Sequence, residues 1–260
     1  RVISDLELGK PFNDLDLRFW ETADELHDRL GETFQDHLGL KNPYDVEGFN
    51  DSLGFDEKGW VPFEDPDGSE NWQILSPVRL HPHGVHDINR WTQKRYRAAE
   101  LKKAEDPWVT SLGDERIVIR DKIIQVANQR RQAYDGSSSE HYVANGEVAL
   151  MGGGKGKFLN AVFAGRPNLR FGYSRRDFPG GSGPLELAYA ITVHKSQGSE
   201  FKTVFVILPK NCRPLSRELM YTAMTRSKQK LVLLIEGKNA SMLFDYSRPE
   251  KSETARRNTN

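Results

Sequence analysis

Two short apolar segments enclose a polar loop between residues 185 and 208, and this arrangement constrains the fold more than any other stretch of the chain. Leu185, Leu187, Tyr189 and Ile191 alternate with smaller or more polar residues, which is the period of a strand. Residues 203–208 form a β-branched and apolar run, typical of a second, buried strand. Polar side chains between two buried strands favour the carboxyl edge of an α/β sheet, where ligands usually bind. A solvated connection is the alternative interpretation.

A second segment, residues 216–234, follows with a helix-then-strand pattern. Leu219, Met220, Ala223 and Met224 recur at helical spacing. Arg226 comes at the end of this expected helix, and residues 231–235 form another buried strand. The alternative interpretation of Arg226 is structural: a positive charge at the end of a helix interacts favourably with the helix dipole.

The two segments resemble consecutive motifs of superfamily 1 helicases. Residues 192–201, Thr-Val-His-Lys-Ser-Gln-Gly-Ser-Glu-Phe, resemble the fifth motif in the RecD-like and UvrD-like branches. Residues 216–234 resemble the sixth motif, and 76–89 resemble the fourth motif more weakly. The resemblance identifies the chain as the C-terminal motor half, RecA-like domain 2 with motifs IV to VI. It implies an α/β fold with a RecA-like parallel sheet.

The resemblance also implies one wall of an ATP site. Arg226 matches the arginine finger, Gly198 the residue whose backbone approaches the γ-phosphate, and Glu200 the acid that contacts the ribose. Arg79 is a further candidate for the phosphates, with a solvated arginine at a strand end as the alternative. Magnesium ligands and the phosphate loop are expected in the N-terminal RecA-like domain of the same protein.

A single strand of DNA is the second implied ligand. Thr192 and His194 match positions that touch single-stranded DNA in the family, and Lys195 adds positive charge beside them. Hydroxyl and imidazole groups bind phosphate without reading sequence. Further phosphate contacts are expected, on charge alone, from four basic residues of the inserted segment described next: Lys155, Lys157, Arg166 and Arg170.

Residues 117–184 differ from the rest by their glycine content and short apolar runs. Asn145-Gly146 predicts a hairpin, and short strands are expected around Val148, Phe158 and Phe171. By resemblance to the RecD-like branch, the segment is an inserted SH3-like β-barrel; a partly disordered insertion is the alternative. The expected domains are 1–116 and 185–246 of the RecA-like domain, 117–184 of the barrel, and a flexible tail 247–260.

The first 116 residues carry simpler patterns. A helix capped by Asp14 or Asp16 is expected through residues 17–38, ended by Gly39. A helix near 46–53, a strand from residue 72 to Ser76 and a helix over 88–101 follow.

One phosphate-loop lookalike is excluded. Gly152-Gly-Gly-Lys-Gly-Lys157 has the wrong glycine spacing, and Phe158 stands where Ser or Thr must bind magnesium. A hairpin tip is the better interpretation. The residues therefore predict no metal ligands in this chain, although ATP with Mg²⁺ is the expected cofactor of the complete enzyme.

Composition limits the environment and the functions. The formal net charge is zero, so a nucleic-acid site must be a local patch. The lone cysteine, Cys212, fits a reducing compartment, no segment has the length of a membrane span, and a cytoplasmic location is expected. The sequence thus predicts half of an ATP-dependent 5′-3′ helicase acting on single-stranded and duplex DNA. A non-catalytic nucleic-acid-binding or regulatory module with the same fold is the alternative, and DNA and RNA substrates are not distinguished.

Overall fold

The chain divides into two compact units. The computed structural model describes residues 13–134, 139–154, 156–248 and 252. The parallel unit comprises Arg1–His37, Trp72–Ile88 and Ala190–Asn260, and the antiparallel unit comprises Leu38–Asn71 and Asn89–Tyr189. The domain boundaries predicted at residues 116, 184 and 246 do not coincide with the ends of these units. The predicted division into domains stays a prediction.

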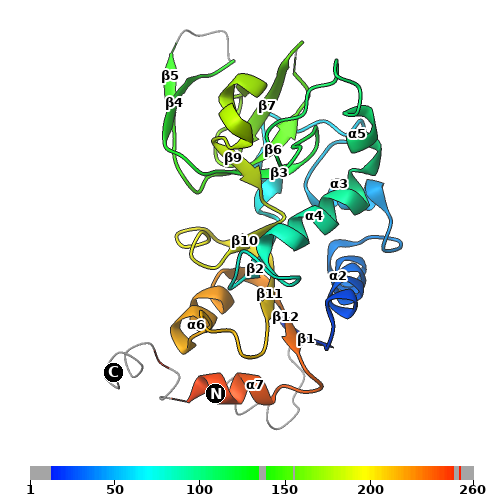
Figure 1. The fold of residues 1–260 in the computed structure, drawn as a ribbon, viewed down its shortest axis with the longest axis vertical. Helices are drawn as coiled ribbons and strands as arrows, with labels where there is room; N and C mark the ends of the chain where they lie inside the picture. The colour runs from blue at the N-terminus through cyan, green and yellow to red at the C-terminus, as the bar shows by residue number, and fades with distance from the viewer. Residues whose placement is uncertain (1–12, 135–138, 155, 249–251, 253–260) are drawn as a thin grey trace. The chain divides into compact units, whose positions relative to one another are not determined.

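A five-stranded parallel sheet forms the centre of the parallel unit (Figure 1). Its order is β1 (Leu15–Trp20), β12 (Ser227–Glu236), β11 (Phe201–Leu208), β2 (Trp72–Ser76) and β10 (Ala190–Thr192). Every neighbouring pair is parallel; Phe205 of β11, for instance, pairs with Ile74 on one side and Val232 on the other. The predicted α/β class with a parallel sheet is therefore confirmed, and the architecture is consistent with a RecA-like helicase domain.

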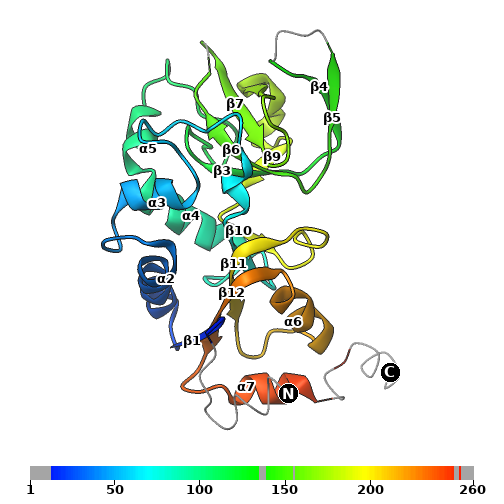
Figure 2. The same cartoon turned by 180° about the vertical axis from the view of Figure 1, so that it is seen from behind.

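Helices lie on both sides of this sheet, as Figures 1 and 2 show. On one side α2 (Ala23–Leu38) packs Phe34 against Trp72 and Phe205, with ring centroids 5.3 and 5.4 Å apart. On the other lies α6 (Arg217–Met224), whose Leu219, Met220 and Ala223 are buried. The last helix is α7 (Ser241–Ser247). Burial of both sheet faces explains why β11 and β12 read as continuous apolar runs.

The antiparallel unit is built on a second five-stranded sheet. Its order is β8 (Phe171–Ser174), β7 (Phe158–Phe163), β6 (Val148–Gly152), β3 (Lys122–Gln125) and β9 (Leu185–Leu187). A ribbon of β4 (Gln129–Gln132) and β5 (Glu140–Val143) lies beside it, joined by a bridge between Ala133 and Phe171. Pairings among the described residues leave β8 and β9 as sheet edges, so the predicted closed barrel is not confirmed.

Helical segments complete the antiparallel unit. They are α3 (Val46–Ser52), α5 (Ala98–Lys103) and three short 3₁₀ turns, Asp67–Glu70, Arg175–Asp177 and Pro179–Gly181. The predicted helix over 88–101 is two helices, because α4 (Val85–Tyr96) ends before Arg97 and α5 begins after it. No helix in the described part of the chain is long and apolar enough to cross a membrane.

The first predicted helix begins too early. Leu15–Trp20 is the edge strand β1, paired in parallel with Leu231–Glu236 of β12, and the helix starts only at Ala23. The amide of Glu25 donates to Thr22 Oγ1 at 3.2 Å, so Thr22 takes the capping role assigned to Asp14 or Asp16. The apolar residues of this segment also fit a helical period. Its pairing with β12, which is distant in the sequence, makes it a strand and not the start of the helix.

The strand expected over residues 185–191 is also two elements. Leu185–Leu187 pairs antiparallel with β3, whereas Ala190–Thr192 pairs in parallel with β2. The chain therefore passes from one sheet to the other at Ala188 and Tyr189. The hairpin expected at Asn145-Gly146 is likewise a turn between sheets, because β5 pairs with β4 and β6 with β3 and β7.

Candidate functional site

The polar loop 193–200 runs from one edge of the parallel sheet to the other. It leaves the carboxyl end of β10 at Thr192 and enters the amino end of β11 at Phe201. Since β10 and β11 both run parallel to β2, the loop must travel back along the whole sheet. The sequence placed the entire loop at the carboxyl edge; that expectation is right for its beginning and wrong for its end.

The amino edge brings together three of the predicted residues. Gly198 has a φ of +87° and no atom within 4 Å of an added Cβ, so the backbone there is open and suited to glycine. Glu200 is exposed, and its carboxylate lies 3.6 Å from Lys228 Nζ. The amide of Phe201 donates to the carbonyl of Arg226 at 2.9 Å, which ties the end of the loop to the end of α6.

The guanidinium of Arg226 is held by oxygen atoms of this same edge. Its Nη1 donates to the carbonyl of Ser199 at 3.2 Å, and its Nε donates to the carbonyl of Thr222 at 3.1 Å. A third bond joins Nη2 to Thr225 Oγ1 at 3.3 Å. Backbone and hydroxyl oxygens are neutral acceptors, weaker partners for a guanidinium than a carboxylate or a phosphate. The guanidinium thus lies beside the loop, and none of these three hydrogen bonds pairs it with a carboxylate.

Helix α6 positions Arg226 through its own sequence. Ser216 Oγ accepts from the amide of Leu219 at 3.1 Å and so caps the first turn. The buried face then fixes the rotation of the helix on the sheet, and the chain leaves it at Thr225 to begin β12 at Ser227. Arg226 is therefore placed at the amino edge by two elements that the sequence predicts.

The carboxyl edge holds the residues predicted to touch nucleic acid. Thr192 ends β10, and its Oγ1 accepts from the amide of Lys195 at 3.3 Å. His194 is exposed and Lys195 half-buried on the turn that follows. Ser196 Oγ donates to the carbonyl of Val193 at 2.7 Å and closes this turn. The three predicted residues lie on one short, internally hydrogen-bonded segment.

Arg79 belongs to this carboxyl edge and not to the amino edge. It follows the end of β2 by three residues, while β2 lies next to β10 in the sheet. The structure thus separates Arg79 from Gly198, Glu200 and Arg226, with which the sequence interpretation grouped it. Its carbonyl accepts from the amide of His86 at 3.0 Å, and its side chain is exposed.

Two features of the carboxyl edge were missed by the sequence interpretation. The buried Ser76 hydroxyl donates to the carbonyl of His83 at 2.9 Å, which holds the loop after β2. His81 and His83 stack with ring centroids 5.6 Å apart, and burial lowers the pKa of His83. The three histidines between residues 81 and 86 were the sequence signal from which this part of the edge could have been predicted.

Three of the four basic residues assigned to the insertion can be placed in the structure, namely Lys157, Arg166 and Arg170. Lys155 lies outside the described residues. Arg166 forms two bonds with Glu147, at 2.6 and 2.7 Å, and Arg170 lies 3.3 Å from the centroid of Phe63. Lys157 precedes β7 at the opposite end of the β7–β8 hairpin from Arg166 and Arg170. The expectation that these residues contact phosphates stays a prediction, and both arginines already have partners in the fold.

The chemistry of the amino edge fits one side of a nucleoside triphosphate. A guanidinium, an unobstructed glycine amide and a carboxylate can meet phosphate and ribose oxygens. Among the described residues, no group of three or more histidine, cysteine or acidic side chains could hold a metal ion.

Comparison with known proteins identifies the family to which this part of the chain belongs. Residues 187–234 match the model of the UvrD-like helicase C-terminal domain. That segment contains the loop 193–200, helix α6, the three amino-edge residues and Thr192, His194 and Lys195 of the carboxyl edge. The chain contains a superfamily 1 helicase C-terminal domain.

Several longer proteins resemble this helicase domain. An uncharacterised protein of Methanocaldococcus jannaschii, MJ1519, is 34% identical over 206 residues, 74% of this chain and 17% of that protein. The ATP-dependent RecD2 DNA helicase of Deinococcus radiodurans is 30% identical over 161 residues, 61% of this chain and 19% of its own length. The RecBCD subunit RecD of Mycobacterium tuberculosis is 41% identical over 92 residues, 31% and 15% of the two chains. The helicase domain thus spans less than a fifth of each.

A solved structure gives a weaker likeness. The Pif1 helicase of Bacteroides in complex with ADP-AlF3 and single-stranded DNA is 15% identical, with a TM-score of 0.34 over 88% of this chain and 55% of the other. A similarity of this size adds nothing to the assignment of the helicase domain, which rests on the sequence matches.

Proposed function

We propose that the chain is the C-terminal motor half of an ATP-dependent DNA helicase and supplies the arginine finger that completes the ATP site. The observation that carries this proposal is the bond from Arg226 to the carbonyl of Ser199, which places the guanidinium beside Gly198 and Glu200. A module that only binds nucleic acid has no need of this arrangement, and for that reason the catalytic role is preferred.

ATP with Mg²⁺ supplies the phosphoryl group whose transfer to water releases the free energy for movement. Residues of this chain would act on one side of it. Arg226 exchanges its neutral carbonyl partners for phosphate oxygens, and its planar fork can hold two at once. Gly198 allows its backbone to approach the phosphates, and Glu200 accepts hydrogen bonds from ribose hydroxyls. The phosphate loop and the magnesium ligands belong to a preceding RecA-like domain of the same protein.

The carboxyl edge of the same sheet is proposed as part of the track for single-stranded DNA. Thr192 and His194 donate hydrogen bonds to phosphates, and Lys195 and Arg79 add positive charge. Because loop 193–200 joins this edge to the amino edge, a change in nucleotide contact at Gly198 moves the chain that carries Thr192. This connection supports a coupling between hydrolysis and movement along the strand, in the 5′-3′ direction that the resemblance of the motifs to the RecD-like branch implies.

Three further assignments belong to this proposal. Residues 117–184 are assigned as an SH3-like barrel inserted between the two parts, 1–116 and 185–246, of the RecA-like domain, with 247–260 as a tail. The enzyme works on single-stranded and duplex DNA in the cytoplasm.

The decisive test is the pair Arg226→Ala and Arg226→Lys in the full-length gene product that carries this chain. Arg226→Ala is expected to lower the kcat of DNA-stimulated ATP hydrolysis by about 10³-fold or more, the scale of arginine fingers. Arg226→Lys should fail nearly as badly, because an ammonium cannot replace the fork. Binding of single-stranded DNA without nucleotide should change little.

Arg217→Ala is the matched control, since Arg217 is an exposed arginine at the start of the same helix. If Arg226 only stabilises the helix end, Arg226→Ala costs about 1 kcal/mol or less of stability, and both variants leave turnover nearly intact. Near-normal turnover in Arg226→Ala would remove the finger assignment.

A further inference from the structure

The hydroxyl of Thr225 lies between the end of helix α6 and the guanidinium of Arg226. It donates to the carbonyl of Thr222 at 3.0 Å and accepts from Arg226 Nη2 at 3.3 Å. Because the one proton of this hydroxyl points at Thr222, a lone pair of its oxygen faces Arg226. The hydroxyl is therefore oriented as an acceptor for the guanidinium, a role that the sequence interpretation did not assign to Thr225.

The hydrogen bonds of Arg226 distinguish two edges of its guanidinium. Nε and Nη2 lie side by side on one edge, and both donate to the helix end, to the Thr222 carbonyl at 3.1 Å and to the Thr225 hydroxyl. Nη1 and Nη2 form the other edge, where Nη1 donates to the carbonyl of Ser199 in the loop at 3.2 Å. Each of these two nitrogens carries a second N–H group. The edge toward the helix is thus occupied, and the edge toward the loop is the one that can accept a new partner.

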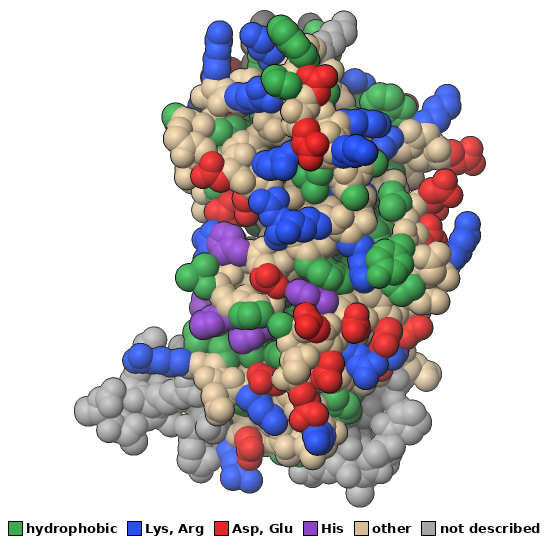
Figure 3. Space-filling model, turned by 45° about the vertical axis from the view of Figure 1, so that its right-hand side comes forward, with side chains coloured by type: hydrophobic (Ala, Val, Ile, Leu, Met, Phe, Trp, Pro, Cys, Tyr) green, Lys and Arg blue, Asp and Glu red, His purple; other side chains and the backbone are tan. Residues whose placement is uncertain are grey.

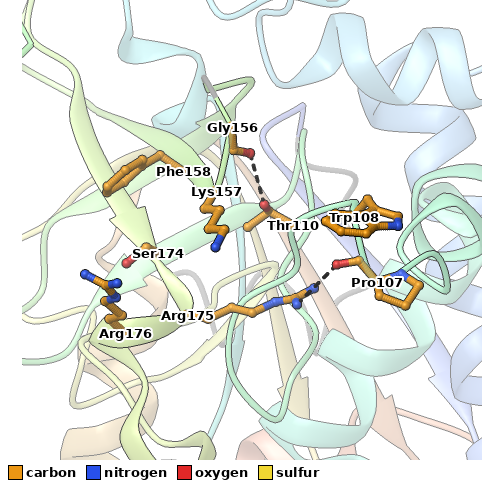
Figure 4. A pocket seen from close by; sticks show the side chains of 9 residues that line it. All are labelled: Pro107, Trp108, Thr110, Gly156, Lys157, Phe158, Ser174, Arg175 and Arg176. Atoms are coloured by element: carbon orange, nitrogen blue, oxygen red, sulfur yellow. Dashed lines mark hydrogen bonds between the residues drawn. The ribbon is translucent and has the colours of Figure 1, made fainter.

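Arg175 shows a different way of holding an arginine in this chain. It donates to the carbonyls of Pro107 at 3.4 Å, Val109 at 3.0 Å and Ser111 at 3.4 Å, and Figure 4 draws the first of these bonds. The acceptors in these bonds are all backbone atoms, which a substitution does not remove. Arg226 differs because one of its acceptors is a side-chain hydroxyl, so its orientation depends on which residue follows Met224.

Charge does not orient the Arg226 side chain in the structure. Among the described residues no carboxylate forms an ion pair with it, and Glu200 of the same edge lies 3.6 Å from Lys228 Nζ instead. The formal net charge of the chain is zero, and acidic and basic side chains are mixed on the face drawn in Figure 3, so no field of one sign acts over long range. Short-range bonds to neutral acceptors therefore set the direction of the guanidinium, and they leave its charge available to phosphate.

We propose that Thr225 is a positioning residue for the arginine finger, an inference that rests on the function proposed above. Its hydroxyl keeps the Nε–Nη2 edge on the helix end while the carbonyl of Ser199 gives way to phosphate. The edge formed by Nη1 and Nη2 then faces two phosphate oxygens, which is the bidentate geometry that a guanidinium favours. Only the bond to Ser199 has to open, which narrows the exchange of carbonyl partners proposed above to a single bond. A finger held in this way needs no reorientation when the transition state forms.

Thr225→Val and Thr225→Ser in the full-length gene product test this role. Valine has the shape of threonine without the hydroxyl, whereas serine keeps the hydroxyl. Thr225→Val should lower the kcat of DNA-stimulated ATP hydrolysis about tenfold, the scale of one hydrogen bond to a charged group, with the KM for ATP within about twofold. Thr225→Ser should restore kcat to within about threefold of the native value. Tyr221→Phe removes an exposed hydroxyl from the same helix and is the control, expected to leave kcat within about twofold.

A double-mutant cycle shows whether Thr225 acts through Arg226. In an Arg226→Ala background, Thr225→Val should change kcat by less than about twofold, because the guanidinium that the hydroxyl positions is absent. A full tenfold loss in that background would overturn the inference, since Thr225 would then act by another route. If Arg226→Ala lowers kcat and Thr225→Val does not, this inference fails while the finger stands. Near-normal turnover in Arg226→Ala removes both.

NMR of the 260-residue chain labelled with ¹⁵N-arginine gives a readout that requires no ATP. The Nε–H signal of Arg226, identified by its absence in Arg226→Lys, should exchange its hydrogen with water faster in Thr225→Val than in the native chain. In Thr225→Ser it should exchange at the native rate. A hydroxyl that only stabilises the helix end would lower the melting temperature of Thr225→Val and leave this hydrogen-exchange rate and kcat unchanged, and that result would overturn the proposal.

Discussion

At the scale of single residues, two adjacent ionisable side chains, Asp121 and Lys122, are completely buried where β3 begins. Asp121 accepts hydrogen bonds from the amide of Val118, Gln93 Nε2 and Tyr189 Oη, each at 2.7 Å, and burial raises its pKa to about 6. Tyr189 ends the antiparallel unit, so this cluster fixes the point at which the chain leaves it. These polar residues are therefore structural, although their burial resembles that of an active site.

Lys122 gives a pH-dependent prediction. Burial lowers its pKa to about 7, with Glu70 opposing the shift, whereas an exposed lysine in the unfolded chain titrates near pH 10.4. Between these values the unfolded state binds more protons, so the Lys122 contribution to the unfolding free energy rises with pH. Lys122→Met should be more stable than the native chain at pH 7, and the difference should shrink toward pH 10.

Denaturant unfolding at pH 7, 8.5 and 10 measures this difference. Lys103→Met, an exposed lysine of the same unit, is the control and should show no such trend. If the difference in unfolding free energy between Lys122→Met and the native chain stays constant with pH, the pKa of Lys122 is not lowered by burial.

At the scale of elements, the loop from β2 to α4 is shaped by glycine and serine. A Cβ at Gly84 would overlap the carbonyl oxygens of Leu80 and Arg79, so the chain can return into α4 only where no side chain is present. Ser76 Oγ holds the same loop through His83. Since this loop carries Arg79, its backbone decides which edge of the sheet the arginine occupies.

Gly84→Ala should therefore destabilise the chain by about 1–3 kcal/mol, the usual cost of forcing a methyl group into a packed site. The loop should also shift, which would weaken binding of single-stranded DNA at the carboxyl edge. Gly172→Ala is the matched control, because an added Cβ there meets its nearest atom at 3.4 Å and lies in strand β8. Equal melting temperatures for the two variants would contradict the steric argument.

At the scale of the whole molecule, the proposed ATP site is shared between this chain and a domain outside it. The chain supplies an arginine, a glycine and a carboxylate at one sheet edge, and its one glycine- and lysine-rich segment, 152–157, precedes strand β7 instead of opening a helix. A phosphate loop needs a helix N-terminus for its anion, and this turn has none. The lookalike is thus a hairpin turn, as the sequence predicted.

The purified 260-residue chain is accordingly expected to hydrolyse no ATP measurably, with or without single-stranded DNA. Phosphate release is the measurement, and the Arg226→Ala chain prepared in the same way is the control. A contaminating enzyme gives the same rate in both preparations. DNA-stimulated turnover in the native chain that disappears in Arg226→Ala would show that the fragment has a complete site.

Elements with local signals could be predicted from the order of residues alone. Strands β2, β11 and β12 are buried on both sides and read as apolar runs, and α6 carries its cap at Ser216 and an apolar face at helical spacing. Gly198, Glu200 and Arg226 were singled out by motif order, although the sequence did not place them at the amino edge. Such features could be predicted because neighbouring residues alone produce them.

Features that depend on residues far apart in the chain became visible only in the folded molecule. Leu15–Trp20 is a strand because β12 lies beside it, and residues 185–192 divide between two sheets because β3 and β2 pair with different halves. Strand direction places Arg79 opposite Arg226. Pairing joins residues far apart in sequence through backbone groups that every residue carries, and for that reason the side-chain pattern does not record it.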